Sequence, residues 1–94
     1  MGYEWLVEAL NQLRGIRPQE VSQVLSAHRR WPRLAKDDVA GLSVLTIWAR
    51  TDLGRPLIVA TRRLDGWDRQ IVGARDMTPG ERAQFEAWEA GQDE

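Results

Sequence analysis

Apolar residues recur at helical spacing in two stretches near the start of the chain. The first stripe predicts a helix over about residues 3–14, and it consists of Trp5, Leu6, Ala9, Leu10 and Leu13. Gly15 follows in the position of a left-handed helix cap. A second helix is expected to begin at Pro18, since proline is favoured at the first helical position, and to end near His28. Its buried face consists of Val21, Val24 and Leu25.

Further along, apolar runs separated by short polar breaks predict three strands over about residues 43–51, 55–64 and 67–76. Asp65-Gly66 predicts a two-residue hairpin turn, because such turns need positive φ. Asp52-Leu53-Gly54 predicts a three-residue loop between the first two strands. Residues 31–35 are compatible with a short edge strand, and residues 36–38 together with Gly41 predict a turn.

The last part of the chain contains a helix start. Thr78 and Glu81 have the spacing of a capping box with Pro79 between them, which predicts a helix over about residues 79–90 carrying Phe85 and Trp88. Residues 91–94 are expected to be a frayed acidic tail. The elements together predict one α+β domain over residues 1–94, with two N-terminal helices, an antiparallel three- to four-stranded meander sheet and one C-terminal helix.

The two turns determine which side chains share a face of the sheet, because side chains alternate along a strand. One face is expected to pack under the first two helices, and it consists of Leu45, Ile47, Ala49, Leu57, Val59, Val72 and Ala74. The opposite face is expected to combine apolar residues, among them Trp48, Ile58, Leu64, Trp67 and Ile71, with Arg50, Arg62, Arg69 and Arg75. In this register Arg62 lies directly across from Arg69, and like charges so placed are destabilising.

An arginine pair beside tryptophans is typical of a surface that binds a ligand with both negative charge and flat rings. Arginines neutralise phosphates and aromatic side chains stack on unpaired bases, so we hypothesise that this face binds RNA. The residues expected to bind it are Trp48, Arg62, Trp67 and Arg69. The alternative is that the C-terminal helix covers part of the face and pairs its glutamates, Glu81, Glu86 and Glu89, with the arginines. A one-residue change in either loop would also separate the cluster.

Composition restricts the chemistry further. The chain has no cysteine and a single histidine, so a disulfide or a thiolate metal site is excluded, and we expect neither a metal nor a cofactor. His28 continues the apolar stripe of the second helix and is interpreted as a boundary residue. The uncharged run over residues 39–49 is too short to span a bilayer, and Glu4 and Glu8 oppose a secretory signal. A cytoplasmic location without membrane contact is therefore expected.

Charge is distributed unevenly, although the net charge is only −1. Residues 14–75 carry 12 basic and 6 acidic side chains, whereas residues 76–94 carry 1 basic and 6 acidic ones. All the basic residues except Lys36 are arginine, whose planar fork suits phosphate and carboxylate. A high-GC coding bias explains the same excess equally well.

The order of segments resembles the BrnT family of toxins, the ribonuclease half of bacterial type II toxin–antitoxin pairs with a RelE-like fold. The similar segments are residues 3–5, 15–21, 49–51, 54–57 and 71–82, and the likeness extends over about residues 3–90. The last segment, from Ile71 to Arg82, is the most specific. The resemblance implies four active-face residues, which are Arg50, Arg75, Glu81 and Arg82. It implies that the arginines contact phosphate, that Glu81 orients an arginine or acts as an acid–base group, and that the partner is a ribbon-helix-helix antitoxin.

Three functions remain open at this stage. The leading one is a metal-independent endoribonuclease toxin, in which the RNA 2′-hydroxyl is the nucleophile and arginines stabilise the charged transition state. Family members often have a histidine where this chain has Arg14, and a tyrosine where it has Phe85. These departures favour the second function, a catalytically inactive relative that binds protein or nucleic acid. The third is an unrelated structural domain whose tryptophans form an oligomer interface. Glu81 also has a plain alternative role as the capping residue.

Overall fold

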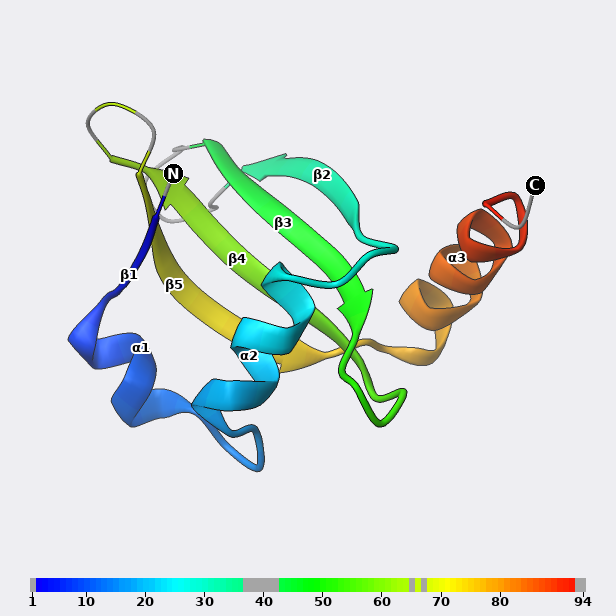
Figure 1. Cartoon of the computed structure of the whole chain (residues 1–94), viewed down its shortest axis with the longest axis horizontal. Helices are drawn as coiled ribbons and strands as arrows, with labels where there is room; N and C mark the ends of the chain where they lie inside the picture. The colour runs from blue at the N-terminus through cyan, green and yellow to red at the C-terminus, as the bar shows by residue number, and fades with distance from the viewer. Residues whose placement is uncertain (1, 37–42, 65, 67, 93–94) are drawn as a thin grey trace.

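The computed structural model describes residues 2–36, 43–64, 66 and 68–92, and these residues form an α+β fold with a five-stranded mixed sheet (Figure 1). The strands are β1 (Tyr3–Trp5), β2 (Trp31–Lys36), β3 (Ser43–Arg50), β4 (Pro56–Arg63) and β5 (Arg69–Asp76). The helices are α1 (Val7–Gln12), α2 (Pro18–Leu25) and α3 (Pro79–Ala90). The strand order across the sheet is β1-β5-β4-β3-β2. The predicted α+β class is confirmed.

The N-terminal segment differs from its prediction. Residues 3–5 form a short strand parallel to β5, with Trp5 opposite Ile71, instead of the first turn of a helix. The sheet is therefore mixed and has five strands, not three or four antiparallel ones. The reason is that β1 forms hydrogen bonds with the backbone N–H and C=O groups along the edge of β5. The amide of Arg69, for example, donates to the carbonyl of Gly2 at 3.0 Å. Trp5 still packs against the core, as the apolar stripe required.

The β3–β4 hairpin has the predicted register. Ala49 lies opposite Leu57 and Ile47 opposite Val59, and the amide of Thr51 donates to the carbonyl of Arg55 at 2.9 Å. Gly54 has a φ of 91°, which is the left-handed geometry expected for that loop. This hairpin places Ile47, Ala49, Leu57 and Val59 on one face of the sheet, which we call the core face.

The β4–β5 hairpin has a different register from the predicted one. Leu64 pairs with Asp68 instead of Trp67, so three residues lie between the paired residues, and Arg63 lies opposite Arg69. A bulge then follows, because Ala60 lies opposite Gly73 whereas Thr61 lies opposite Ile71. The result is that Ile71, and not Val72, enters the core, where it is 2% exposed. The larger side chain buries more apolar surface, which favours this register.

The core face is covered by α1 and α2, which lie together on the near side of the sheet in Figure 1. Its buried cluster joins residues of α2 to the sheet, and its members are Ile16, Val21, Val24, Leu25, Ile47, Ala49, Leu57, Val59 and Ile71. The opposite face, which we call the far face, contributes Trp48 and Ile58 to a second cluster with Phe85 of α3. Both faces of the sheet are therefore packed against helices, and α3 takes the far face.

The start of α3 is formed as predicted. The Thr78 hydroxyl accepts a hydrogen bond from the amide of Glu81 at 3.2 Å, and the Glu81 carboxylate accepts one from the amide of Thr78 at 2.9 Å.

Among the described residues, no helix is long and apolar enough to cross a membrane. The predicted turn over residues 36–38 with Gly41 lies largely outside the described residues, as do Asp65, Trp67 and residues 93–94 of the predicted tail.

Candidate functional site

Arg50, at the end of β3, is held by α3. Its Nε and Nη2 atoms donate to the two carboxylate oxygens of Glu89 at 2.9 and 3.0 Å, and Glu86 lies 3.6 Å from Nη2. Its Nη1 donates to the carbonyl of Gly54. The hydrogen bond with Glu89 raises the pKa of the guanidinium above its ordinary value. The predicted phosphate contact is thus already occupied by two carboxylates of the same chain.

Arg75, near the end of β5, forms a second fork with α3. Its Nη1 and Nη2 atoms donate to the two carboxylate oxygens of Glu81 at 2.5 and 2.7 Å. This contact is the main cause that lowers the pKa of Glu81 to about 2, and the amide of Thr78 adds to it. The ionised carboxylate of Glu81 therefore accepts hydrogen bonds from Arg75 and Thr78 at neutral pH. It positions Arg75 and caps α3.

The three remaining predicted arginines, Arg62, Arg69 and Arg82, make separate contacts. Arg82 is half exposed on α3 and pairs loosely with Glu86 at 3.6 Å. Arg62 does not lie across from Arg69, so that prediction is wrong. Arg62 is exposed and its Nε donates to Gln70 at 2.6 Å, whereas the Nε of Arg69 donates to Thr61, which belongs to the buried side of the sheet. The changed hairpin register and the bulge are the physical cause, since each one-residue shift reverses the faces of a strand.

The aromatic residues of the far face are packed inside the protein. Trp48 is only 7% exposed, and its indole N–H donates to Thr46. Trp31 meets Trp48 edge-to-face and stacks in parallel on Trp88, with ring centroids 5.4 Å apart in both pairs. The guanidinium of Arg33 lies over both Trp31 and Trp48. With α3 in this position Trp48 cannot stack on a base, and Trp67, the other predicted stacking residue, lies outside the described residues.

A shallow groove remains open on the far face beside Arg75, and we call it the Arg75 groove. It has a volume of about 280 Å³, and its lining residues are Thr46, Ile58, Ala60, Gly73, Ala74 and Arg75. Ala60 and Gly73 lie directly opposite each other on neighbouring strands, and their small size creates the depression. The groove thus combines a flat apolar floor with one oriented guanidinium at its side. Neither Ala60 nor Gly73 was predicted as a site residue, although both fall on the predicted far face.

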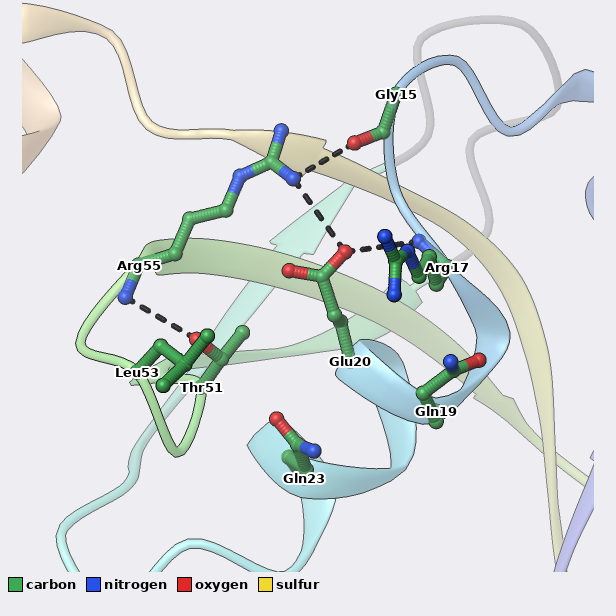
Figure 2. Close-up of a pocket in the computed structure, with 8 residues that line it drawn as sticks. All are labelled: Gly15, Arg17, Gln19, Glu20, Gln23, Thr51, Leu53 and Arg55. Carbon is green, nitrogen blue, oxygen red and sulfur yellow. Dashed lines mark hydrogen bonds and ion pairs between the residues drawn. The ribbon is translucent and has the colours of Figure 1, made fainter.

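A larger cleft, of about 420 Å³, lies between the start of α2 and the β3–β4 loop (Figure 2). Figure 2 shows Arg55 reaching across it toward Gly15 and Glu20, where its Nη1 donates to the Gly15 carbonyl at 2.7 Å. The same guanidinium forms a fork with Asp76 at 2.9 Å to each oxygen. Glu20 in turn accepts from the amide of Arg17.

These contacts join the α1–α2 connection, the β3–β4 loop and the end of β5. Three of the segments that carry the family resemblance, residues 15–21, 54–57 and 71–82, thereby meet at Arg55. The sequence showed these three segments only separately. Nothing in it indicates that they meet in space at Arg55. Arg55 thus acts as a structural clamp, since its one guanidinium joins Gly15, Glu20 and Asp76.

No protein-family model matches the chain, and no curated protein matches its sequence. The resemblance to the BrnT family therefore stays a prediction that the comparisons do not test. Within the described ranges, no group of three or more His, Asp or Glu side chains is arranged to hold a metal ion.

Proposed function

We propose that this protein is a BrnT-like endoribonuclease toxin with a RelE-like fold, which acts on RNA at the Arg75 groove. The observation that carries the proposal is the groove itself, where an oriented guanidinium lies beside a flat apolar floor of Ala60 and Gly73. A base or ribose fits flat against such a floor, while the guanidinium binds the adjoining phosphate. Apart from the parallel strand β1, which precedes the helices, the order α1, α2, β2 to β5 and α3 supports the proposed fold.

In the proposed reaction the RNA supplies its own nucleophile: the 2′-oxygen attacks the adjacent phosphorus and its proton passes to water. The P–O5′ bond breaks, and the leaving 5′-oxygen takes a proton from water, so the products are a 2′,3′-cyclic phosphate and a 5′-hydroxyl. Arg75 stabilises the negative charge that develops on the phosphate oxygens, and its fork with Glu81 keeps the guanidinium in one orientation before RNA arrives. Arg82 follows Glu81 directly in the chain and is half exposed. It is the second cation that we propose to stabilise the phosphate charge. Neither a metal ion nor a cofactor has a role in this scheme.

The proposal changes the role expected for Arg50. Arg50 faces two carboxylates, Glu89 and Glu86, and its side chain is only 27% exposed, against 54% for Arg75. In this proposal Arg50 therefore holds α3 against the sheet, and Arg75 is the arginine that RNA reaches. A positioning residue of this kind affects cleavage only through the placement of α3. The antitoxin of the ribbon-helix-helix type stays part of the proposal, on the resemblance alone.

A second candidate function is a nucleic-acid-binding or protein-binding module without catalysis. Two features of the groove favour this second function. The pKa of Glu81 is lowered to about 2, so its carboxyl has already lost its proton at neutral pH, and the groove's lining contains no histidine. A protein with such a groove binds an RNA strand, but the groove's described lining contains no imidazole or carboxylic acid to protonate the leaving 5′-oxygen. The two candidates differ only in turnover, and one experiment separates them.

The experiment is induced expression in a bacterial host, followed by growth measurement and mapping of RNA 5′ ends. The wild-type chain is expected to arrest growth and to generate new 5′ ends. Arg75→Ala removes the cation, and Gly73→Leu fills the groove, since a Cβ atom there meets no heavy atom of the described residues within 4 Å. Both variants are expected to abolish the new ends, whereas Arg63→Ala, at the exposed end of β4, is expected to retain them.

The outcomes decide between the candidates. Full growth at high expression of folded wild-type protein contradicts the toxin proposal. RNA binding that Arg75→Ala and Gly73→Leu weaken, with no new 5′ ends, supports the binding module instead. Cleavage that persists in both variants removes the Arg75 groove from consideration.

A further inference from the structure

The guanidinium of Arg75 keeps a pair of donors in reserve. An arginine side chain has five N–H groups, and the internal contacts of Arg75 use three of them. Nη1 donates to Glu81 and to the backbone carbonyl of Asp76, and Nη2 donates once to Glu81. Within the described part of the chain, the N–H of Nε and the second N–H of Nη2 take no partner. In a planar guanidinium these two groups lie side by side and parallel, and we call them the side fork of Arg75.

Arg50 and Arg55, which also form forks with carboxylates, differ in the edge of the guanidinium that they use. In Arg50, the Nε and Nη2 atoms donate to the carboxylate of Glu89. In Arg55, the same two atoms donate to the carboxylate of Asp76. The side forks of these two arginines are therefore filled by acidic side chains of the same protein. The acid that holds Arg75 takes it end-on instead, so Arg75 is able to bind a second anion without losing the first.

The side fork of Arg75 opens onto a surface that a ligand can reach. The side chain of Arg75 is 54% exposed, and it lines the Arg75 groove together with Ala60 and Gly73. A Cβ atom added at Gly73 meets no heavy atom of the described residues within 4 Å, so the space above this floor is open. The groove's volume of about 280 Å³ is close to the lower limit of about 300 Å³ for small-ligand pockets, which suits one nucleotide and not a longer run.

The geometry of the side fork selects the kind of anion. Two parallel N–H donors match two oxygen atoms bound to one phosphorus atom, so the contact is bidentate. The 2′,3′-cyclic phosphate formed in the proposed reaction keeps both non-bridging oxygens of the scissile phosphate. Its ribose and base adjoin the phosphorus directly and provide the flat part of the ligand that the apolar floor accommodates.

We propose that the Arg75 groove binds a nucleoside 2′,3′-cyclic monophosphate, with the phosphate on the side fork and the nucleoside on the floor of Ala60 and Gly73. This inference rests on the proposed function for the identity of the ligand. Its consequence is that the cleaved strand stays bound by its new 3′ end and competes with uncleaved RNA, because both present the same two oxygens to Arg75.

The test is a titration of isotope-labelled wild-type protein with uridine 2′,3′-cyclic monophosphate, followed by NMR. The Nε–H signals of the arginine side chains report on the side forks directly. We expect the Nε–H signal of Arg75 to move, together with the backbone amide signals of Ala60 and Gly73. The Nε–H signals of Arg50 and Arg55 are the internal controls and are expected to stay in place, because their donors are already occupied. Movement of all three Nε–H signals alike shows unspecific attraction to cations and overturns the inference.

A charge-conserving variant separates the fork from the charge. Arg75→Lys keeps the positive charge but has no planar fork, and it is expected to weaken binding of the cyclic nucleotide about tenfold, since one charge-assisted hydrogen bond is lost. Arg63→Lys makes the same exchange at the exposed end of β4 and is expected to bind like wild type. If folded Arg75→Lys binds as tightly as wild type, a point charge is sufficient and the inference is wrong.

Two further ligands test the inference on the wild-type protein alone. Inorganic phosphate at constant ionic strength is expected to bind more weakly than the cyclic nucleotide, and equal affinity shows that the floor contributes nothing and overturns the inference. Guanosine carries no phosphate, but O6 and N7 of its base also form a pair of acceptors for an arginine fork. If guanosine moves the Nε–H signal of Arg75 and the cyclic nucleotide does not, the fork reads a base edge, which contradicts the proposal.

The outcome is distinguishable from that of the proposed function. If the cyclic nucleotide binds at Arg75 while wild-type protein produces no new RNA 5′ ends, the nucleotide site stands and the endoribonuclease proposal fails. If wild-type protein cleaves RNA but the cyclic nucleotide neither moves the Nε–H signal of Arg75 nor slows cleavage, the inference fails and the proposed function stands.

Discussion

The ion pair between Arg75 and Glu81 makes a sharp prediction about stability. Glu81→Gln removes the negative charge but keeps an acceptor for the amide of Thr78, because glutamine also serves at this position of a capping box. The substitution therefore isolates the ion pair from the cap. Its effect on the free energy of unfolding follows from the pKa of Glu81, which the fold lowers from 4.5 to about 2.

The magnitude follows from that change in pKa. A fall of this size corresponds to at most about 3 kcal/mol of stabilisation of the ionised form. The side chain of Arg75 is 54% exposed, so solvent screening reduces the contribution to about 1–2 kcal/mol. For a chain of this size such a loss lowers the Tm by about 5–10 °C.

The pH dependence has a defined sign. The pKa of Glu81 is lower in the folded state than in the unfolded state, so its contribution is complete above about pH 4.5 and is lost as the pH falls toward 2. The free energy of unfolding of wild-type protein and Glu81→Gln, measured by urea titration with tryptophan fluorescence, is therefore expected to differ at pH 7 and to converge in acid. Glu8→Gln, an exposed position on α1, is the control and is expected to match wild type at pH 7.

Two results would refute this reasoning. If Glu81→Gln is as stable as wild type at pH 7, the fork with Arg75 contributes nothing in solution and Glu81 acts only as a cap. If the difference in stability persists unchanged at low pH, its cause is packing or capping and not charge. In either case Arg75 is not held by Glu81 before RNA binds, and the preorganisation in the proposed mechanism fails.

Two further predictions concern packing and backbone conformation. Phe85 is fully buried between α3 and the far face, so Phe85→Ala is expected to cost about 3–5 kcal/mol in urea unfolding; a loss below about 1 kcal/mol would mean that α3 is not docked on the sheet in solution. Gly54 has a φ of 91°, so Gly54→Ala is expected to lower the free energy of unfolding by about 1–2 kcal/mol. Gly73→Ala, on a strand without positive φ, is expected to be neutral within about 0.5 kcal/mol in the same assay, and equal effects at the two glycines would contradict the conformational argument.

The difference between the two hairpins shows how far local sequence determines register. In the β3–β4 loop, Gly54 is the one residue that readily adopts positive φ, and a three-residue loop follows from it. In the β4–β5 loop, Gly66 has the positive φ that was expected, but the pairing of Leu64 with Asp68 adds a residue to the loop. Local turn preferences differ by too little to exclude either length, and burial of Ile71 in the core selects the longer one.

The placement of α3 determines the character of the far face. The sequence predicted the helix and its cap correctly, and it also allowed the glutamates of this helix to pair with arginines of the sheet. It did not indicate which arginines would be paired, because that depends on the angle at which α3 crosses β3. In the structure Arg50 meets Glu89, Arg75 meets Glu81 and Trp88 stacks on Trp31, so α3 covers the part of the predicted surface around Trp48 and Arg50.

The sequence by itself determined the α+β class, the N-terminal cap of α3, the start of α2 and the register of the first hairpin, because each depends on residues close together in the chain. The tertiary structure decided the parallel strand β1, the bulge in β5, the clamp at Arg55 and the pairing of Arg50 and Arg75 with α3. These features join residues far apart in the chain, and their energies come from burial and charge pairing that exist only after the elements have packed together.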